Sequence, residues 1–457
     1  MTLVRFAPSP TGFLHIGNAR TALFNALFAI QTGGQFVLRL DDTDVARSTQ
    51  EFADTIEVDI AWLGIGVAQI ERQSARLERY NQVRDDLKER GLLYPCYETP
   101  EELEYKRKRQ MALGKPPVYD RAGLNLSQAE REAFEADGRS PHWRFKLEGR
   151  RVTWTDRCKG EQTIDTASQS DPVLIREDGS YLYTLPSIID DMDFGITDVI
   201  RGEDHVSNTG TQIEIFEALG ATAPGWAHHN LLTAADGTAL SKREGSLSLK
   251  ALREEGTQAM AVASVATLVG TSLPIELHGS LAELSHTFDL GTVSSGPARF
   301  EPKQIEDFSA QLVHALEPDS VRQDLSEMGI PAELIDQLWL AVRRNCARVS
   351  DVKHWWTMLQ ADALAWEDLN WDNPADDAAF LYAAKDKLPT DPLSDETWSV
   401  WTGALKDETG RKGKSLFMPL RKALTGLERG PEMGPILQLL GREKAVGRLE
   451  RAAHSVK

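Results

Sequence analysis

The sequence of 457 residues predicts an α/β region in its first two thirds and an all-helical region after about residue 305. The first forty residues alternate a short apolar strand, an amphipathic helix and a second apolar strand. After residue 305, apolar side chains instead recur at helical spacing, with no strand pattern between them. The length suffices for three or more domains with cores of their own.

The amino-terminal elements predict a strand–helix–strand unit. Residues 2–7 form a short apolar run, and apolar side chains recur at helical spacing over 22–30. Gly33 and Gly34 are expected to end this helix, and residues 36–40 form the next strand. Short connections of this kind predict a parallel, right-handed crossover, which places the loop before the helix at the carboxyl end of the sheet. Helix N–H groups face outward there and favour bound phosphate.

Further elements extend this unit and then interrupt it. A capping-box pattern at Ser48 predicts the start of a second helix, which Gly64 closes. From about residue 77 to 180 the pattern changes to charged helices and short alternating strands, which predicts an insertion. The α/β fold is expected to resume at residue 181, with a helix over about 208–219.

A loop rich in proline and glycine precedes the first helix. It reads Pro8-Ser-Pro-Thr-Gly12 and then His15-Ile-Gly-Asn18. The prolines stiffen the chain, while Gly12 and Gly17 allow the backbone to lie close to a ligand. An imidazole beside bare N–H groups at a helix N-terminus can bind the phosphates of a nucleotide.

A second motif, Leu240-Ser-Lys-Arg243, lies in a small, polar, glycine-punctuated stretch over 233–246. This composition is typical of a surface loop. Lys242 can contact the β- and γ-phosphates as charge develops, and so stabilise the transition state more than the ground state. Either motif alone is common by chance, but the two together, in this order, indicate a site that activates a nucleotide.

Five segments, in order, are similar to those of the bacterial-type glutamyl-tRNA synthetases, which are class I aminoacyl-tRNA synthetases. They are RFAPSPTGFLHIGN (5–18), RLDDTD (39–44), TDVIRGED (197–204), LSKR (240–243) and PLRKALTG (419–426). The resemblance covers essentially the whole chain. It implies ATP-dependent ligation of L-glutamate to tRNA through a glutamyl-adenylate, with release of AMP and pyrophosphate.

The resemblance also implies a domain organisation. It combines α/β with all-α structure, as a class I Rossmann-like catalytic domain, an inserted acceptor-end-binding domain, a stem-contact region and a C-terminal helical anticodon-binding region. The expected boundaries are 1–76 with 181–235 for the catalytic domain, 77–180 for the insertion, 236–304 for the stem-contact region and 305–457 for the anticodon-binding region.

By resemblance, ATP would contact Pro8, Gly12, His15, Gly17, Asn18, Leu240, Ser241 and Lys242. The expected catalytic residues are His15, Lys242 and Arg243. Glutamate carries one ammonium and two carboxylates, so its pocket needs guanidinium groups and a carboxylate. The expected glutamate-binding residues are Arg5, Ala7, Ser9, Asp41, Tyr183, Ser187 and Arg201. Arg201 is expected to bind the side-chain carboxylate, whereas for Arg5 a structural ion pair is an equal alternative.

The chain departs from the family pattern at three positions. Asp41 stands where many relatives have glutamate, and Ser187 stands where many have asparagine. Ala239 stands where the family loop often has its first lysine, so Lys242 is expected to carry the phosphate contacts. The ionic character of the pocket is kept, so glutamate remains the expected substrate.

The net charge of −18 argues against a protein that coats nucleic acid nonspecifically. It does not exclude a tRNA enzyme, because affinity depends on local basic surface such as residues 106–109. Arg348 falls where the family places an anticodon-contacting arginine. The tryptophans between Trp339 and Trp401 are expected to pack in a core rather than stack on bases.

The three cysteines, Cys96, Cys158 and Cys346, lie far apart in the sequence and form no C-x-x-C pair. Some relatives carry a zinc knuckle in the insertion, but the matching region here has a single thiol, so no zinc is expected. The resemblance implies Mg²⁺ only as the partner of ATP.

The sequence shows neither a signal peptide nor an apolar span of membrane length, so a soluble, cytoplasmic protein is expected, with a monomer as the default.

Three alternatives share the catalytic half. A shortened relative that glutamylates a modified base within tRNA lacks the helical carboxyl-terminal domains. Glutaminyl-tRNA synthetase has a β-rich carboxyl-terminal region, unlike the helical pattern here. A non-catalytic tRNA-binding paralogue would not need His15, Lys242, Arg5 and Arg201, which are all present. The partner is expected to be tRNA(Glu), and whether tRNA(Gln) is also charged stays open at this point.

Overall fold

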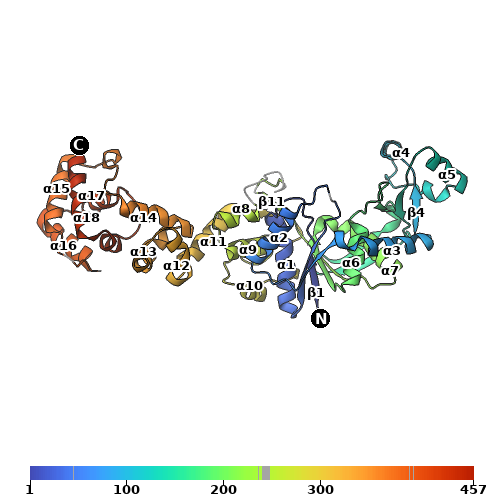
Figure 1. Cartoon of the computed structure of the whole chain (residues 1–457), viewed down its shortest axis with the longest axis horizontal. Coiled ribbons are helices and arrows are strands. Elements are labelled where there is room, and N and C mark those ends of the chain that lie inside the picture. Colours follow the sequence, from blue (N-terminus) through green and yellow to red (C-terminus); the bar gives the residue numbers. More distant parts are fainter. Residues whose placement is uncertain (45, 235, 239–247, 391, 395, 457) are drawn as a thin grey trace. The chain divides into compact units, whose positions relative to one another are not determined.

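The computed structural model describes residues 1–44, 46–234, 236–238, 248–390, 392–394 and 396–456. The chain divides into two compact units, each coloured by sequence in Figure 1. The first unit is Met1–Glu255 with Ala259–Ile305, and the second is Gly256–Gln258 with Glu306–Lys457.

The first unit alternates strands and helices. Its strands are β1 (Leu3–Phe6), β2 (Gln35–Leu40), β3 (Gln69–Arg72), β4 (Leu93–Cys96), β5 (His142–Phe145), β6 (Arg151–Asp156), β7 (Gly160–Asp165), β8 (Val173–Ile175), β9 (Asp198–Gly202), β10 (Gly225–His229), β11 (Leu232–Ala234) and β12 (Ala298–Phe300). Its α-helices are α1 (Ile16–Thr32), α2 (Gln50–Trp62), α3 (Leu77–Glu89), α4 (Pro100–Ala112), α5 (Gln128–Ala136), α6 (Thr184–Asp193), α7 (Val206–Ala218), α8 (Leu249–Glu254), α9 (Ala259–Leu268) and α10 (Leu281–Thr287).

The main sheet has seven strands in the order β3-β2-β1-β9-β10-β6-β7. All neighbouring pairs in it are parallel except β6 with β7, and β1 pairs with β2 from Leu3↔Gln35 to Phe6↔Leu38. The predicted parallel strand–helix–strand unit is therefore confirmed. The chain runs from β1 outward to β2 on one side and places β9 on the other, so a crevice is expected beyond the carboxyl ends of β1 and β9.

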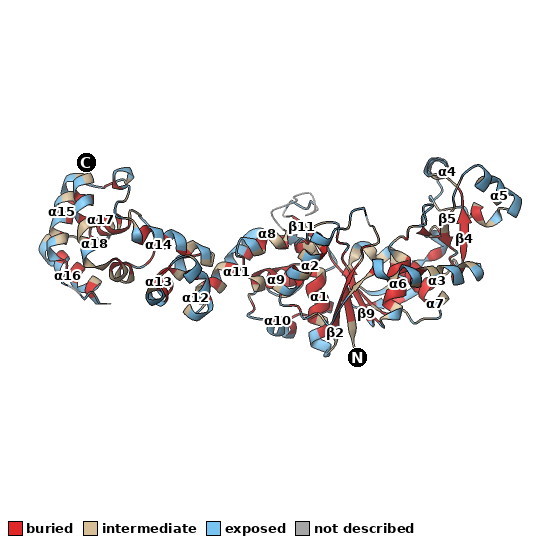
Figure 2. Cartoon of the chain, in the orientation of Figure 1, coloured by how far each residue is buried: buried red, intermediate tan, exposed pale blue. Residues whose placement is uncertain are grey.

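Helix α1 covers this sheet and is capped at both ends. Its N-cap is His15, and the helix ends at Gly33, which has the left-handed backbone (φ 59°) that glycine adopts without strain. Figure 2 shows α1 as one of the most buried helices of the unit, and it packs against α9 and α10. The expected start of α2 is wrong by one residue, because the side chain of Thr49, not Ser48, accepts the capping hydrogen bond from Phe52 N.

The region from 77 to 180 contributes to two sheets. Strands β6 and β7, over 151–165, continue the main sheet next to β10. Strands β4, β5 and β8 instead form a separate antiparallel sheet, near which α4 and α5 lie (Figure 1). The portion that leaves the main fold is therefore smaller than the whole interval from 77 to 180.

The described residues of the second unit form helices joined by turns and loops, with no strand among them. Its helices are α11 (Pro302–Ala315), which begins in the first unit, α12 (Pro318–Glu327), α13 (Ile335–Val342), α14 (Val352–Gln360), α15 (Pro374–Lys387), α16 (Thr397–Thr409), α17 (Lys414–Thr425) and α18 (Met433–Ser455). Most of the tryptophans predicted to lie in the core are buried there, Trp339 and Trp401 fully, while Trp356 and Trp398 are partly buried and pack against it. The indole N–H groups of Trp339 and Trp401 donate to the carbonyls of Leu316 and Ala384, so these two rings are not available to stack on bases.

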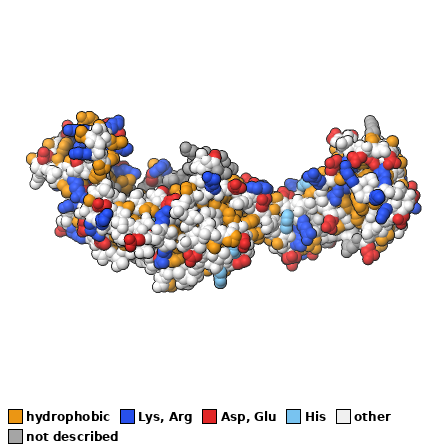
Figure 3. Space-filling view, turned by 180° about the vertical axis from the view of Figure 1, so that it is seen from behind, with side chains coloured by type: hydrophobic (Ala, Val, Ile, Leu, Met, Phe, Trp, Pro, Cys, Tyr) orange, Lys and Arg blue, Asp and Glu red, His pale blue; other side chains and the backbone are white. Residues whose placement is uncertain are grey.

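Charges of both signs are interspersed over the face shown in Figure 3, so the net negative charge is not gathered there in one acidic surface. None of the helices in the described part of the chain is long and apolar enough to span a bilayer.

Candidate active site

A cavity of about 530 Å³ lies at the carboxyl ends of β1, β2, β9 and β10, at the crevice that the strand order predicts. It brings together most of the residues expected in the site. Those that line it are Arg5, Ala7, Pro8, Ser9, His15, Gly17, Asn18, Asp41, Tyr183, Ser187 and Arg201. Gly12 does not line it. The second motif, Leu240, Ser241, Lys242 and Arg243, lies outside the described residues, as does Ala239.

His15 caps α1 at the edge of this cavity. Its Nδ1 accepts a hydrogen bond from Gly17 N (3.0 Å), and the Asn18 side chain accepts one from His15 N (3.1 Å). Although the side chain is exposed, the surrounding protein partly shields the ring from water and lowers its pKa. A neutral ring whose Nδ1 accepts carries its proton on Nε2. The Nε2–H group is therefore the donor that His15 can offer to a phosphate.

Gly17 leaves room for the ring of this histidine. A Cβ built at Gly17 would lie 2.8 Å from His15 Cε1 and 3.0 Å from Nδ1, so any side chain must displace the ring. We expect Gly17→Ala to lower kcat/KM for ATP by about tenfold, equal to ~1.4 kcal/mol of transition-state stabilisation. The measurement is pyrophosphate exchange at varied ATP.

Gly66→Ala is the matched control for this substitution, because a Cβ there meets no atom within 4 Å. A Gly17→Ala protein with the kinetics of the Gly66→Ala protein would show that the position of the His15 ring does not matter for ATP.

Buried charges form a network behind the cavity. Arg5 Nε lies 3.1 Å from Asp191 Oδ1, and Arg39 Nη1 lies 2.7 Å from the same oxygen. Arg39 also binds Asp41 through Nε (2.7 Å) and Nη2 (3.2 Å). Burial raises the pKa of Asp41, and the charge of Arg39 opposes that rise. The carboxylate expected to bind the ammonium group is thus already paired, although it keeps lone pairs that face the cavity.

Ser187 and Tyr183 complete this wall. Ser187 Oγ accepts from Arg39 Nη2 (3.2 Å) and lies 3.5 Å from Asp41 Oδ2, so the serine joins the charge network directly. Tyr183 is 40% exposed, and its hydroxyl accepts from Asn208 Nδ2 at 2.6 Å. The Tyr183 hydroxyl proton therefore remains available to a ligand.

Arg201, at the end of β9, is held by neutral groups only. Its Nε donates to His228 Nε2 (3.1 Å), and its Nη2 donates to Gln212 Oε1 (2.7 Å) and Thr209 Oγ1 (2.9 Å). The guanidinium lies over the ring of Trp226, 4.8 Å from its centre. No carboxylate of the described residues lies within ion-pair distance, and Nη1 makes no hydrogen bond to them.

The two arginines expected to bind glutamate therefore differ. Both are buried, at 7% exposure for Arg5 and 8% for Arg201, but only Arg5 has a carboxylate partner, Asp191. Burial, together with the nearby charge of Arg5, lowers the pKa of Arg201 to about 10. A buried cation without a counter-ion is costly, and an anionic ligand would remove that cost.

Sequence reasoning missed several residues of this site. Arg39 belongs to the RLDDTD motif, but nothing in that motif indicates that its guanidinium joins Asp41 to Asp191. The pair Asp190-Asp191 follows the apolar residues of α6, and two adjacent acids on an apolar helix are a signal for buried ion pairs. No local sequence pattern marks His228 as part of the site, because its partners Asp156 and Arg201 lie on other strands.

Arg348 lies in the second unit, at the turn between α13 and α14, and its backbone N–H donates to Asp351 Oδ2 (2.9 Å). Two other basic residues near the end of the sequence have structural partners. Arg411 is paired with Asp377 at 2.7 Å, and the ammonium of Lys422 donates to the carbonyl of Asn370. These contacts make both side chains less available to RNA.

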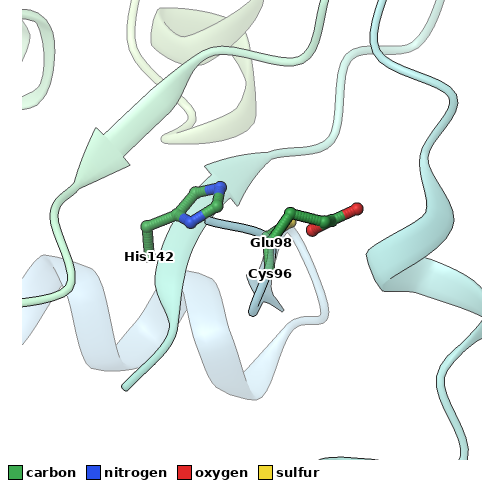
Figure 4. Close-up of side chains that lie close together, drawn as sticks. All are labelled: Cys96, Glu98 and His142. Atoms are coloured by element: carbon green, nitrogen blue, oxygen red, sulfur yellow. The ribbon is translucent and has the colours of Figure 1, made fainter. Parts of the chain in front are cut away.

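One cluster of candidate metal ligands occurs among the described residues: Cys96, Glu98 and His142 (Figure 4), whose ligand atoms lie within 4.8 Å of one another. Burial raises the pKa of the Cys96 thiol to about 11. The Glu98 carboxylate already accepts from Lys106 Nζ (3.0 Å) and from a tyrosine hydroxyl, that of Tyr119 (3.0 Å).

The His142 ring is a better donor than the other two. Burial lowers its pKa to about 4, and Nε2 is buried without a partner. A zinc site, however, needs deprotonated thiolates and usually four ligands. Three candidate ligands with a single thiol, one of them a carboxylate already paired with a lysine, do not fit that requirement.

Comparison with known proteins agrees with this geometry. Residues 1–307 match the family model described as tRNA synthetases class I (E and Q), catalytic domain, and residues 311–453 match an anticodon binding domain. The chain is 53% identical over 453 residues to glutamate–tRNA ligase 2 of Methylobacterium radiotolerans, covering 99% of this chain and 100% of that protein. The chain belongs to the glutamate–tRNA ligase family.

Other relatives agree with this assignment. Glutamate–tRNA ligase 2 of Methylorubrum populi is 54% identical over 447 residues, 98% of each chain. A crystal structure of a glutamate tRNA ligase from Elizabethkingia meningosepticum in complex with its amino acid superposes with a TM-score of 0.86 at 25% identity, covering all of both chains.

Membership of this family confirms the expected fold class, a class I catalytic domain with a parallel Rossmann-like sheet followed by a helical anticodon-binding domain. It also decides against the shortened base-modifying relative, because the anticodon-binding part is present. The glutaminyl alternative predicted a β-rich end, whereas the described residues after Glu306 are helical.

Proposed function

We propose a residue-by-residue route by which this chain performs the activity of its family, the ATP-dependent ligation of L-glutamate to tRNA. The observation that carries it is Arg201, a buried guanidinium without a carboxylate partner among the described residues, at the wall of a cavity that also holds a helix N-terminus. An anionic side chain fits beside Arg201, and phosphates fit beside the N–H groups of α1.

The amino acid is proposed to lie across the ends of β1 and β9. Its side-chain carboxylate would accept from Arg201 Nη1 and from the Tyr183 hydroxyl, because both donors line the cavity and neither is used by a described neighbour. Its ammonium would donate to Asp41 and to the exposed Ser9, with Ala7 contributing backbone. Arg5 and Ser187 would hold the walls in place through Asp191 and Arg39.

ATP is proposed to lie along the loop before α1. Pro8, Gly12, Gly17 and Asn18 would shape the contact with the nucleotide, and His15 Nε2–H would donate to a phosphate oxygen. Lys242 and Arg243, with Leu240 and Ser241 beside them, would contact the leaving phosphates. Mg²⁺ enters as the metal of the Mg·ATP substrate.

The chemistry needs no protein nucleophile. An α-carboxylate oxygen of glutamate attacks the α-phosphorus in line, the bond to the bridging β-phosphate oxygen breaks, and pyrophosphate leaves. A ribose hydroxyl at the 3′ end of tRNA then attacks the acyl carbon of the adenylate, and AMP leaves. The protein contributes position and charge stabilisation.

The tRNA is proposed to contact several parts of the chain. Residues 77–180 would hold the acceptor end through the sheet of β4, β5 and β8 and the exposed basic side chains of α4. Residues 236–304 would contact the stem, and the helices over 305–457 would hold the anticodon, with Arg348 as one reader of it. The chain would charge tRNA(Glu). Relatives either accept only tRNA(Glu) or also charge tRNA(Gln).

Pyrophosphate exchange tests this function as a whole. We expect exchange that depends on L-glutamate, is much weaker with L-glutamine, and rises on addition of tRNA(Glu). Charging assays with tRNA(Glu) and tRNA(Gln) then define the range of tRNA accepted. Exchange supported equally by glutamine, or none with any tRNA, would contradict the proposed route.

The purified protein is expected to contain no stoichiometric zinc. The reasons are that the cluster holds a single thiol and that Glu98 already accepts from Lys106 and Tyr119. The measurement is elemental analysis of protein expressed in zinc-supplemented medium, with Cys96→Ser as the comparison. One zinc per chain that is lost in Cys96→Ser would show that the cluster with His142 binds metal after all.

The active form is proposed to be a monomer. The second unit has an extensive hydrophobic core of its own, and the first unit buries its sheet beneath its own helices, so neither needs a second copy to cover it. Light scattering at assay concentrations should give the mass of one chain.

A further inference from the structure

Arg201 is the end of a line of three buried side chains on neighbouring strands. Asp156 ends β6, His228 lies in β10, and Arg201 lies in β9, where it pairs directly with His228 in the sheet register. Asp156 Oδ2 lies 2.5 Å from His228 Nδ1, and His228 Nε2 lies 3.1 Å from Arg201 Nε. Only Arg201 lines the cavity, so the other two lie behind it.

The direction of these hydrogen bonds fixes the tautomer of the histidine. Arg201 Nε–H can only donate, so His228 Nε2 must accept and carry no proton. The Thr209 hydroxyl, 3.1 Å from the same nitrogen, can then donate to it as well. A neutral ring then has its proton on Nδ1, where the Asp156 carboxylate accepts it. Burial, together with the nearby positive charge of Arg201, lowers the pKa of His228, in agreement with a neutral ring.

Asp156 is itself held in one orientation. Its Oδ1 accepts from three backbone N–H groups, those of Cys158 (3.0 Å), Lys159 (3.1 Å) and His228 (3.1 Å), so only Oδ2 faces the ring. The side chains of Asp156 and His228 are both fully buried, so neither faces bulk water. The carboxylate therefore sets the proton position on a ring that contacts the arginine.

We propose that Asp156 and His228 are positioning residues for glutamate selection: Asp156 keeps the His228 proton on Nδ1, and the bare Nε2 holds the Arg201 guanidinium so that Nη1 faces the substrate carboxylate. This inference rests on the proposed role of Arg201. Thr209 and Gln212 fix Nη2, so with Nε also fixed the plane of the guanidinium is determined. Neither Asp156 nor His228 lines the cavity, so both would act through Arg201.

Asp156→Asn is the sharpest test, because it removes the negative charge by replacing one carboxylate oxygen with an amide nitrogen and leaves the shape of the side chain nearly unchanged. The three backbone N–H groups require an oxygen, so the new amide nitrogen must face His228 Nδ1 and donate to it. That moves the ring proton to Nε2, where it opposes Arg201 Nε–H. We expect the KM for glutamate to rise by about tenfold to a hundredfold, with the KM for ATP little changed.

Two variants of His228 and one control accompany it. His228→Leu removes the acceptor, and should raise the glutamate KM as Asp156→Asn does. His228→Gln places an amide oxygen near the former Nε2, and should recover most of the lost affinity. Asp198→Asn removes another buried carboxylate on β9, one that binds Arg157 rather than Arg201, and should leave the glutamate KM unchanged.

Steady-state aminoacylation with saturating tRNA gives both KM values and kcat, and thermal unfolding is measured alongside. A purely structural role would lower the melting temperature of Asp156→Asn and Asp198→Asn alike without a selective rise in glutamate KM, and that result overturns the proposal. So does a His228→Gln protein no better than His228→Leu. Arg201→Gln in the same assay distinguishes the role of Arg201 from the role of the residues behind it. If Arg201→Gln selectively weakens glutamate use and Asp156→Asn does not, only the positioning role fails. If Arg201→Gln does not selectively weaken glutamate use, the proposed role of Arg201 fails as well.

Discussion

Lys242→Ala should lower the rate of glutamyl-adenylate formation by about two to three orders of magnitude, or roughly 3–4 kcal/mol, because it removes one charged contact made in the transition state. The affinity for tRNA should change little, since the lysine would contact the phosphates of ATP. The measurement is tRNA-supported pyrophosphate exchange, with tRNA binding followed separately. Because position 239 is alanine, no lysine there can replace the lost contact. The fall in rate should therefore be larger than in a relative whose loop has two lysines.

Lys250→Ala is the matched control. Lys250 follows the same segment in sequence, but its ammonium lies over the Phe13 ring, 4.6 Å from its centre, and does not line the cavity. Its rate should stay close to that of the unchanged protein. A Lys242→Ala protein with near-normal exchange would mean that another group, such as Arg243, carries the phosphate contact.

Arg201→Gln should lower the ratio of kcat/KM for glutamate over glutamine by tenfold or more. Removing the guanidinium leaves the buried side-chain carboxylate of the substrate glutamate unpaired, which costs on the order of 2–5 kcal/mol of binding free energy. Substrate glutamine has a neutral side chain that can hydrogen-bond to the new amide at position 201, so its binding should weaken much less. The KM for ATP should change little. The measurement is aminoacylation with each amino acid under the same conditions.

Arg448→Gln provides a control of the same chemistry in the second unit. Arg448 is fully buried and donates to the carbonyls of Met358 (2.6 Å) and Ala361 (2.7 Å). Its loss should lower stability without changing the choice between amino acids. If Arg201→Gln reduces the use of both amino acids equally, or weakens ATP instead, then Arg201 is structural and Arg5 must bind the side-chain carboxylate.

Local sequence patterns predicted the elements of the amino-terminal unit well. The strand, helix and strand of residues 2–40 follow from apolar spacing and from Gly33, all of which are short-range signals. The burial of the tryptophans follows from helical periodicity in the same way. The pairing of β6 with β10 could not be predicted, because it joins strands more than sixty residues apart and no local pattern specifies a sheet neighbour.

The same limit applies to the site. The family resemblance predicted most of the residues that line the cavity. It did not indicate which of their charged side chains already form ion pairs with other residues of the chain. Asp41 was expected to bind an ammonium, and it pairs with Arg39 only two residues away. The hydrogen bond that joins Arg39 to Ser187 depends instead on how β2 meets α6. The difference between Arg5 and Arg201 depends on Asp191, which pairs with Arg5 although 186 residues separate the two in sequence. Long-range ion pairs of this kind decide function and leave no trace in spacing.

A crystal structure of the protein with L-glutamate bound tests the central claim most directly. The account predicts that the side-chain carboxylate accepts from Arg201 Nη1 at about 2.7–2.9 Å, as charge-assisted hydrogen bonds do. Arg5 should remain on Asp191, and His228 should still accept from Arg201 Nε. A side-chain carboxylate bound by the Nη groups of Arg5, with Arg201 held only by His228, Thr209 and Gln212, would contradict it.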